Sequence, residues 1–303
     1  MKWDAVLIAG PTASGKSAAA LDLARHINGA LINADAMQVY KEAPILTAQP
    51  DVEARAQAPH LLYGHVPARE LYSVGRYAED ARRALFEVRA IGKLPIFVGG
   101  TGLYFTALTQ GLADIPPIPV EVRAKARALL DEIGVGVLHA RLSARDPGTA
   151  AELRATDPQR VVRAWEVLEA TGRPLIQWRK EQRPPLLEGL KLARFVLDPA
   201  RQILRAKIAE RFETMFDHGG AAEALALAGL DPAFPAAKLL GLRQLAAHAQ
   251  GRLSREAAIA EAVTATRQFA KRQLTWFRSR MADYDWFDPS ISNIIAQYDD
   301  FFT

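Results

Sequence analysis

Residues 10–17 have the residue types and the spacing of a phosphate-binding loop. They read Gly-Pro-Thr-Ala-Ser-Gly-Lys-Ser and satisfy the pattern G-x-x-x-x-G-K-[ST] at every position. An apolar predicted strand, Ala5–Ala9, precedes them, and an Ala/Leu-rich predicted helix, 18–26, follows. This order aims backbone N–H groups and the positive end of a helix dipole at one anion. We expect Lys16 to place its charge on the phosphates and the Ser17 hydroxyl to bind Mg²⁺.

The loop leaves open which phosphate compound is bound, and whether that compound is hydrolysed, transferred or expelled. Two further polar turns follow predicted strands and bear on this question. The first is Asp35-Ala36-Met37-Gln38-Val39-Tyr40. A carboxylate at Asp35 could bind Mg²⁺ through water or accept a proton, and Gln38 carries the donor and the acceptor needed to recognise a base edge. The alternative is a helix N-cap at Asp35 and a surface position for Gln38.

The second polar turn is Gly99-Gly100-Thr101-Gly102-Leu103-Tyr104. Its glycines would let the backbone approach a ligand closely, and Thr101 offers one hydroxyl. A plain tight turn would have the same composition, so the spacing does not decide between the two.

Strands and helices alternate in the N-terminal third of the chain. Strand-like runs at 5–9, 30–34 and 94–98 are separated by helical stretches such as 74–91. This order predicts an α/β fold with a parallel, P-loop NTPase-like sheet, whose ligands bind beyond the carboxyl ends of the strands.

The texture of the sequence changes after a proline-rich hinge at 114–119. We predict a mainly helical insertion domain over 113–190, and a core formed by 1–112 and 191–303. A strand-like run returns at 193–197, 200–280 is again helical, and the acidic, aromatic tail from 281 is expected to be peripheral.

Basic residues gather in two helical regions. Between Thr264 and Arg280 the chain has Arg267, Lys271, Arg272 and Arg278 but no acid. On a helical wheel Lys271 and Arg278 fall close to Arg267, which favours contact with a nucleic-acid backbone over a merely solvated face. In the insertion, Asp157-Pro158 is a helix start, and Arg160 and Arg163 share a face. These two, and likewise Arg123 and Arg211, could equally be ordinary surface arginines.

Composition excludes several classes of protein. The chain has 303 residues, a formal net charge of +4 and no cysteine, so disulfides, thiolate zinc and cysteine nucleophiles are excluded. No apolar run has the length of a membrane span, and a core strand follows Met1 with no signal peptide before it. We expect a cytoplasmic protein without membrane contact.

Six segments together resemble the tRNA dimethylallyltransferases, also called tRNA isopentenyltransferases. The segments, in chain order, are 10–17, 35–40, Thr47-Ala48-Gln49-Pro50, 99–104, 157–167 and 266–273. Their order and joint occurrence are far more specific than a phosphate loop alone. The resemblance runs from Gly10 to about Arg278.

The resemblance implies prenyl transfer from dimethylallyl diphosphate to the N6 amine of the adenine immediately 3′ of the anticodon in tRNA. It implies Asp35 as the general base, Thr101 and Gln38 on the acceptor adenine, and Lys16 and Arg211 on the departing diphosphate, with Mg²⁺ on Ser17. The implied diphosphate-binding residues are Gly10, Pro11, Thr12, Ala13, Ser14, Gly15, Lys16 and Ser17. The implied tRNA-binding residues are Asp35, Ala36, Met37, Gln38, Thr101, Arg123, Gln159, Arg160, Val161, Val162, Arg163, Arg267, Lys271 and Arg272. We expect the tRNA anticodon stem-loop as partner, and a monomer.

Three positions depart from the family pattern. The family often has serine at Ala36, lysine at Gln49 and tyrosine at Leu242, so contacts at the rim of the site differ here. Three alternative functions share some of these features: an ATP-using small-molecule P-loop kinase, a prenyltransferase for free adenine nucleotides, and a non-catalytic RNA-binding or nucleotide-switch protein. None of them accounts for Asp35, Thr101, the basic segment and the helical insertion together.

Overall fold

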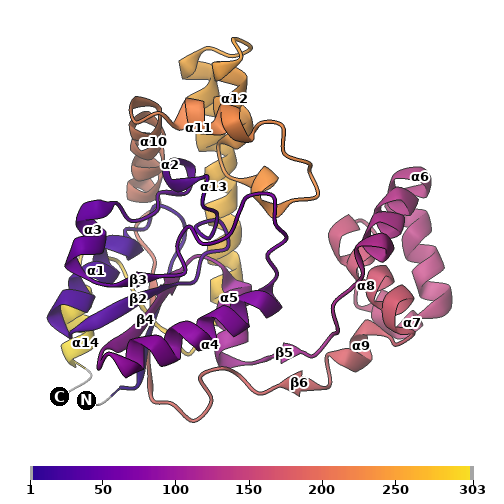
Figure 1. Ribbon diagram of the computed structural model, residues 1–303, viewed down its shortest axis with the longest axis horizontal. Coiled ribbons are helices and arrows are strands. Elements are labelled where there is room, and N and C mark those ends of the chain that lie inside the picture. The colour runs from indigo at the N-terminus through magenta and orange to yellow at the C-terminus, as the bar shows by residue number, and fades with distance from the viewer. Residues whose placement is uncertain (1–2, 301–303) are drawn as a thin grey trace. The chain divides into compact units, whose positions relative to one another are not determined.

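The computed structural model describes residues 3–300 and divides into two compact units (Figure 1). One comprises Met1–Leu108 and Leu186–Thr303, and the other is Thr109–Pro185. The second unit begins and ends about four residues earlier than the expected insertion, 113–190. The reason is its two-stranded antiparallel sheet, β5 (Leu112–Ala113) with β6 (Gln182–Arg183), which ties both ends of the segment together.

The larger unit is built on a six-stranded sheet in the order β3-β2-β4-β1-β7-β8, whose pairings are all parallel. Its strands are β1 (Ala5–Ala9), β2 (Gly29–Asn33), β3 (His60–Leu61), β4 (Leu94–Gly99), β7 (Leu192–Leu197) and β8 (Asp285–Phe287). The α/β fold with a parallel core is therefore confirmed. Because β1 lies between β4 and β7, the loop that follows β1 emerges at the middle of the carboxyl edge.

Helices cover both faces of this sheet, since alternate residues of the buried strands point to opposite sides. Leu7 and Phe97 belong to the larger core with α4 and α10–α13, whereas Val6 and Ile96 pack with α1 and α14. The helices are α1 (Lys16–His26), α2 (Pro44–Thr47), α3 (Val52–Gln57), α4 (Val74–Ala90), α5 (Gly102–Thr109), α10 (Arg201–Asp217), α11 (Gly220–Leu227), α12 (Leu242–Ala249), α13 (Arg255–Arg280), α14 (Ile294–Asp300) and the 3₁₀ turn η1 (Pro235–Lys238).

The C-terminal segment is part of this core, so the expectation of a peripheral tail is wrong. β8 pairs with β7 from Asp285 to Phe287, and Phe287, Ile294 and Tyr298 are buried. Apolar side chains at these positions cover a sheet edge that would otherwise be open, and one face of α1. The free energy gained by burying them outweighs the cost of the acidic residues nearby.

The second unit is helical. Its helices are α6 (Val120–Arg145), α7 (Pro147–Ala151), α8 (Pro158–Thr171) and α9 (Leu175–Trp178). α6 is kinked at Gly134, whose φ is 74°. α8 begins as expected, because the Asp157 side chain accepts a hydrogen bond from the Arg160 backbone N–H and Pro158 occupies the first turn. Leu138, Leu142, Val161 and Ala164 form the centre of a separate small core.

Candidate active site

The phosphate loop joins β1 to α1 in the conformation that its sequence predicts. Gly15, with φ 86°, is the residue before α1, and the Ser14 N–H donates to the Pro11 carbonyl at 3.2 Å. The Lys16 ammonium donates to the same carbonyl at 3.2 Å. Burial lowers the pKa of Lys16 to about 8, against the opposing pull of Asp35. Burying an ammonium group without a paired acid is costly, and an anion bound beside Lys16 would offset that cost.

A pocket of about 240 Å³ opens over this loop. Its polar wall comprises Thr12, Ala13, Ser14, Gly15, Lys16, Ser17, Asp35, Gln38 and Arg211. Its apolar wall includes Met37, Leu46, Leu239, Leu240 and Phe269. The pocket therefore has one end suited to phosphate and one side suited to a short hydrocarbon.

Arg211 reaches this pocket from α10 and is not an ordinary surface arginine. Its guanidinium donates to the Thr12 hydroxyl at 2.8 Å and to the Leu46 carbonyl at 3.2 Å. Its Nε is buried without a hydrogen-bond partner, and burial lowers its pKa. Across residues 3–300, no carboxylate lies within ion-pair distance of Lys16 or Arg211, so both charges remain available to a bound anion.

A third cation near the loop, Lys207, was missed by the sequence analysis. A Cβ placed on Gly15 would lie 3.7 Å from the Lys207 Nζ. Lys207 stands four residues before Arg211 on α10, one helical turn away on the same side. That spacing is the only signal in the sequence that could have found it.

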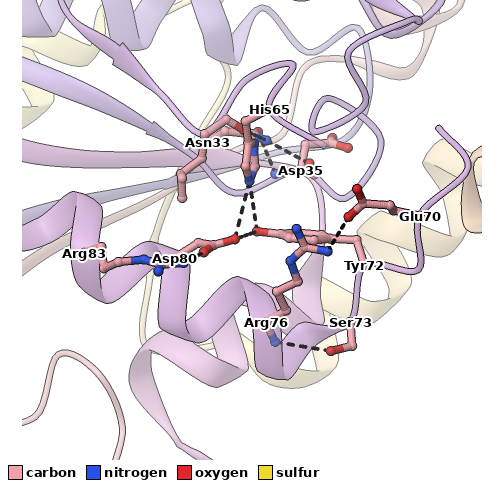
Figure 2. A network of polar contacts seen from close by, with 10 residues as sticks. Asn33, Asp35, His65, Glu70, Tyr72, Ser73, Arg76, Asp80 and Arg83 are labelled. Atoms are coloured by element: carbon pink, nitrogen blue, oxygen red, sulfur yellow. Dashed lines mark hydrogen bonds and ion pairs between the residues drawn. The ribbon is translucent and has the colours of Figure 1, made fainter. Parts of the chain in front are cut away.

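Asp35 follows β2 and is held by Asn33, the last residue of that strand (Figure 2). The Asn33 side chain accepts from the Asp35 N–H at 2.8 Å and donates to the carbonyls of Asp35 and Leu62, each at 3.0 Å. One carboxylate oxygen of Asp35 accepts from the Met37 N–H at 2.9 Å, which makes a local turn and not a helix N-cap. The other oxygen, Oδ2, lies beside Gly100.

Thr101 holds the same loop from the next strand. Its Oγ1 accepts from the Ala36 N–H at 2.8 Å, and its own N–H donates to the Ala34 carbonyl at 3.2 Å. The Thr101 hydroxyl proton remains available for a ligand, although Thr101 is not among the residues that line the pocket. The hydrogen bond from the Ala36 N–H thus places the Thr101 side chain next to the Asp35 turn.

The neighbouring glycines are required by packing within the protein. A Cβ on Gly100 would overlap the Gln273 amide, and one on Gly102 would overlap the Trp276 ring, both on α13. Gln273 accepts from the Thr12 N–H at 2.9 Å and donates to the Gly100 carbonyl at 2.8 Å. It therefore ties the phosphate loop to the Gly99–Thr101 turn. The glycines were expected to let the backbone approach a ligand closely. In the structure they let α13 approach the turn closely instead.

Gln38 lies in the pocket wall, but half of the prediction for it is wrong. Its amide group donates to the carbonyls of Thr47 and Ala48, at 3.1 and 2.8 Å, and the side chain is buried. Only its carbonyl oxygen can face a ligand, so Gln38 cannot present both a donor and an acceptor to a base edge.

Glu223 supports the apolar wall from α11, a role that no pattern in the sequence predicts. Its carboxylate accepts from the N–H groups of Ile45 and Leu46, at 3.0 and 2.7 Å, at the start of α2. Burial raises the pKa of Glu223. Since Arg211 bonds to the Leu46 carbonyl, Glu223 indirectly fixes that guanidinium.

A second polar network lies behind the Asp35 loop (Figure 2). Tyr72 donates to Asp80 at 2.7 Å, Arg83 pairs with Asp80, and the His65 Nε2 lies 3.3 Å from the Tyr72 hydroxyl. These contacts fasten the segment after β3 to α4. The His65 segment is in turn joined to Asp35 through the Leu62 carbonyl and Asn33.

The basic residues of α13 separate onto different sides of the helix. Arg267 and Lys271 face a groove against α10, together with Arg278. Arg272 lies instead with its guanidinium 5.8 Å from the centre of the Phe269 ring. The face of this segment that packs on the protein is mixed, since it buries the polar Thr266 and Gln273 together with Ala270 and Phe277.

In the second unit, α8 exposes only part of the predicted set of RNA contacts. Gln159 and Arg160 are exposed, and Arg163 is partly buried beside Glu166 at 3.5 Å. Burial lowers the pKa of Arg163, and the charge of Arg123 lowers it further, so these two arginines are neighbours. The side chains of Val161 and Val162 lie in the helical core, and the prediction that they contact RNA is wrong for the side chains.

Ser17 is the residue that could hold a metal ion here. Its side chain is exposed at the first turn of α1 and lines the same pocket as Asp35. Among residues 3–300, no group of three or more His, Asp or Glu side chains gathers as a metal cage. One hydroxyl and one nearby carboxylate fit Mg²⁺, which keeps most of its ligands as water and substrate phosphate.

The parallel sheet, with its phosphate loop at the carboxyl end of β1, puts this chain in the P-loop class of α/β proteins. Within that class it belongs to the IPP transferase family, whose sequence model matches residues 38–280. The chain is accordingly an enzyme, a transferase. Within residues 3–300, none of the helices combines the length and the apolar character needed to cross a membrane.

Curated relatives agree with this assignment over nearly the whole chain. A tRNA dimethylallyltransferase of Bradyrhizobium sp. (strain ORS 278) is 50% identical over 287 residues, which is 94% of this chain and 93% of that protein. One from Methylocella silvestris is 48% identical over 297 residues, covering 97% and 98% of the two chains.

Solved structures resemble the chain as well. A crystal structure described as a eukaryotic dimethylallyltransferase acting on tRNA matches with a TM-score of 0.78 at 27% identity, over 94% of this chain and 73% of that one. The tRNA isopentenylpyrophosphate transferase of Bacillus halodurans matches with a TM-score of 0.64 at 33% identity, over 94% and 89%.

Proposed function

We propose that this enzyme transfers a dimethylallyl group from dimethylallyl diphosphate to the N6 amine of the adenine immediately 3′ of the anticodon in tRNA, releasing diphosphate. Relatives about 50% identical over 94% of the chain carry the name tRNA dimethylallyltransferase. A structural neighbour is described as acting on tRNA. In this reaction the phosphate loop binds the diphosphate leaving group, and no phosphoryl group is transferred.

The two-sided pocket is the observation that carries the proposal. Lys16 and Arg211 supply two positive charges at one end, with no carboxylate paired to either among the described residues. Leu46, Leu239 and Phe269 supply an apolar wall beside them. A five-carbon allylic chain suits that wall. The nucleoside of ATP would instead need polar partners for its ribose and base.

The proposed reaction needs one bond made and one bond broken. The adenine N6 forms a bond to the first carbon of the dimethylallyl group as the bond from that carbon to the diphosphate oxygen breaks. The electron pair leaves with diphosphate, where Lys16 and Arg211 neutralise the growing charge. The N6 proton passes to the Asp35 carboxylate, which makes this weakly nucleophilic amine competent.

The acceptor adenine is proposed to lie against the Asp35 turn. Thr101 keeps its hydroxyl proton for a ring nitrogen, because its oxygen already accepts from Ala36. The Gln38 carbonyl oxygen can accept one further hydrogen bond. The adenine must leave its stack to arrive there, as in other enzymes that act on a base.

Magnesium is the proposed cofactor. Ser17 would hold it together with oxygens of the bound diphosphate, within reach of Asp35. When bound, the ion would add positive charge at the leaving group.

The proposal extends to the partner and the setting. Arg123, Gln159, Arg160 and Arg163 of the second unit, and Arg267, Lys271 and Arg272 of α13, are proposed contacts of the anticodon stem-loop. The protein is proposed to act as a cytoplasmic monomer.

A donor comparison tests the function. The enzyme is incubated with an anticodon stem-loop RNA or with AMP, and with dimethylallyl diphosphate or γ-labelled ATP. We expect prenyl transfer from dimethylallyl diphosphate to the RNA, much faster than to AMP, and no label transfer from ATP. Comparable rates with AMP would contradict the tRNA assignment, and label transfer from ATP would favour a kinase.

A further inference from the structure

A second concave site lies outside the catalytic pocket, between α10 and α13. It encloses about 670 Å³. Its floor is apolar, formed by Leu204, Ile208, Ala270 and Leu274, and its rim is polar and basic. The two helices contact each other within the larger unit, to which both belong (Figure 1).

The rim carries an excess of positive charge from both helices. α13 contributes Arg267 and Lys271, and α10 contributes Arg201 and Arg205. All four side chains are exposed, and none has an acidic partner within ion-pair distance among residues 3–300. The fifth cation, Arg278, is paired with Asp198 at 3.0 Å. Four cations therefore face one groove uncompensated.

The four charges repel one another in the free protein. The positive charges of Arg267 and, to a lesser degree, Arg201 lower the pKa of Arg205, so these guanidinium groups interact electrostatically. A chain that only needed a solvated surface would gain from interspersed acids. A polyanion laid in the groove would turn this repulsion into attraction.

The groove is arranged for successive phosphates. Arg201 and Arg205 are one turn apart on α10, and Arg267 and Lys271 are one turn apart on α13, which gives about 6 Å between neighbours along each helix. The same helices lead to the catalytic pocket. Arg205 precedes Arg211 by six residues, about 9 Å of helix, and Lys271 precedes Gln273 by two.

We propose that Arg201 and Arg205, with Arg267 and Lys271, form a binding site for the sugar-phosphate backbone of the RNA substrate beside the target adenine. This inference rests on the proposed function and adds α10 to the RNA-binding surface. The contacts position the RNA without reading its sequence, as backbone contacts do. The single diphosphate of the donor is already served by Lys16 and Arg211.

The test is RNA binding over a series of salt concentrations. The variant R201Q/R205Q should weaken binding of an anticodon stem-loop roughly 10- to 30-fold at about 0.15 M salt, and reduce the slope of log K against log salt by roughly 1.4–1.8. R201K/R205K should restore most of both, since lysine keeps the charge. R25Q, near the C-terminal end of α1, is the matched control and should bind like the wild type.

Turnover separates this inference from its rivals. At saturating RNA the double glutamine variant should keep the wild-type kcat, and its KM for dimethylallyl diphosphate should not change. Wild-type RNA affinity and salt slope in this variant would overturn the inference, as would a raised KM for the donor with unchanged RNA binding. If the wild type itself neither binds nor prenylates the RNA, the proposed function fails instead.

Discussion

In the proposed reaction, Asp35 does the acid–base work, and Lys16 and Arg211 supply positive charge. Among residues 3–300, Asp35 is the one carboxylate that lines the pocket, and it is not paired with either Lys16 or Arg211 there. Its orientation is set by Asn33 and by the Met37 N–H, so one oxygen is committed and Oδ2 remains. A carboxylate that is already held in position loses little conformational entropy when it reaches the transition state for proton transfer.

Replacing the base tests its role most simply. Asp35→Asn keeps the shape but cannot accept the N6 proton, so we expect kcat to fall roughly 10²- to 10⁴-fold with RNA affinity nearly unchanged. Steady-state kinetics with the stem-loop, and direct RNA binding, measure the two quantities. A kcat within a few-fold of the wild type would remove Asp35 from the role of base.

Lys16 gives the donor site a predictable pH dependence. Burial holds its pKa at about 8 in the free enzyme, below that of an ordinary lysine. In the proposed reaction the charged form of Lys16 binds diphosphate, so binding would need a proton on Lys16 once the pH exceeds that value. We expect the affinity for dimethylallyl diphosphate to fall up to tenfold per pH unit between about pH 8 and 10.

Calorimetric titration of the donor, without RNA, measures this pH dependence. Lys16→Gln should bind the donor more weakly at pH 7 and show a flatter profile above pH 8. A wild-type affinity that stays constant from pH 8 to 10 would contradict the assigned role of Lys16.

The sequence could identify only some residues of the site. Lys16, Ser17 and Asp35 sit in short motifs next to predicted strands, so their placement at one sheet edge follows from the fold. Gln273 and Glu223 could not be recognised, because their partners Thr12 and Ile45 lie 261 and 178 residues away in the chain. Gln38 was misjudged because its amide donors are satisfied by a local loop.

At the scale of elements, buried strands and amphipathic helices were predictable. β1 has the predicted bounds, and β4 and β7 differ from theirs by one residue. The predicted helix 74–91 forms as α4 over Val74–Ala90, and Tyr77, Ala81 and Val88 on its inner face are buried. β8 escaped prediction because it has three residues, one of them an exposed aspartate, and forms only by pairing with β7.

The contact of α5 with α13 yields a prediction about stability. Gly102→Ala places a methyl group in the Trp276 ring, and such overpacking costs about 1–3 kcal/mol, partly offset by a helix preference of up to about 1 kcal/mol. Gly229→Ala is the control, since nothing lies within 4 Å of its added Cβ.

Urea unfolding of the two variants measures the difference. The free energy of unfolding of Gly102→Ala should fall, and that of Gly229→Ala should stay within about 0.5 kcal/mol of the wild type. Because Thr101 precedes Gly102, kcat should fall as well. Equal stability of both variants would mean that α13 does not pack this closely on the turn.

At the scale of the whole molecule, the larger unit contains every residue for which a catalytic role is proposed. Lys16, Asp35, Thr101 and Arg211 all belong to Met1–Leu108 and Leu186–Thr303. The second unit, Thr109–Pro185, has its own core and its own neighbouring arginines, Arg123 and Arg163. In the proposed reaction, bond formation therefore takes place in the larger unit, and the RNA is recognised by surfaces on both units.

The proposed function is tested most directly by identifying the product of the reaction. The enzyme is incubated with dimethylallyl diphosphate and two anticodon stem-loops, one with adenine and one with purine, which lacks the N6 amine, immediately 3′ of the anticodon. Digestion and mass spectrometry locate the added group. We expect one dimethylallyl group on N6 of that adenine, and no product from the purine-containing RNA. Modification of the purine RNA, of another nucleotide, or of neither RNA would contradict the proposed function.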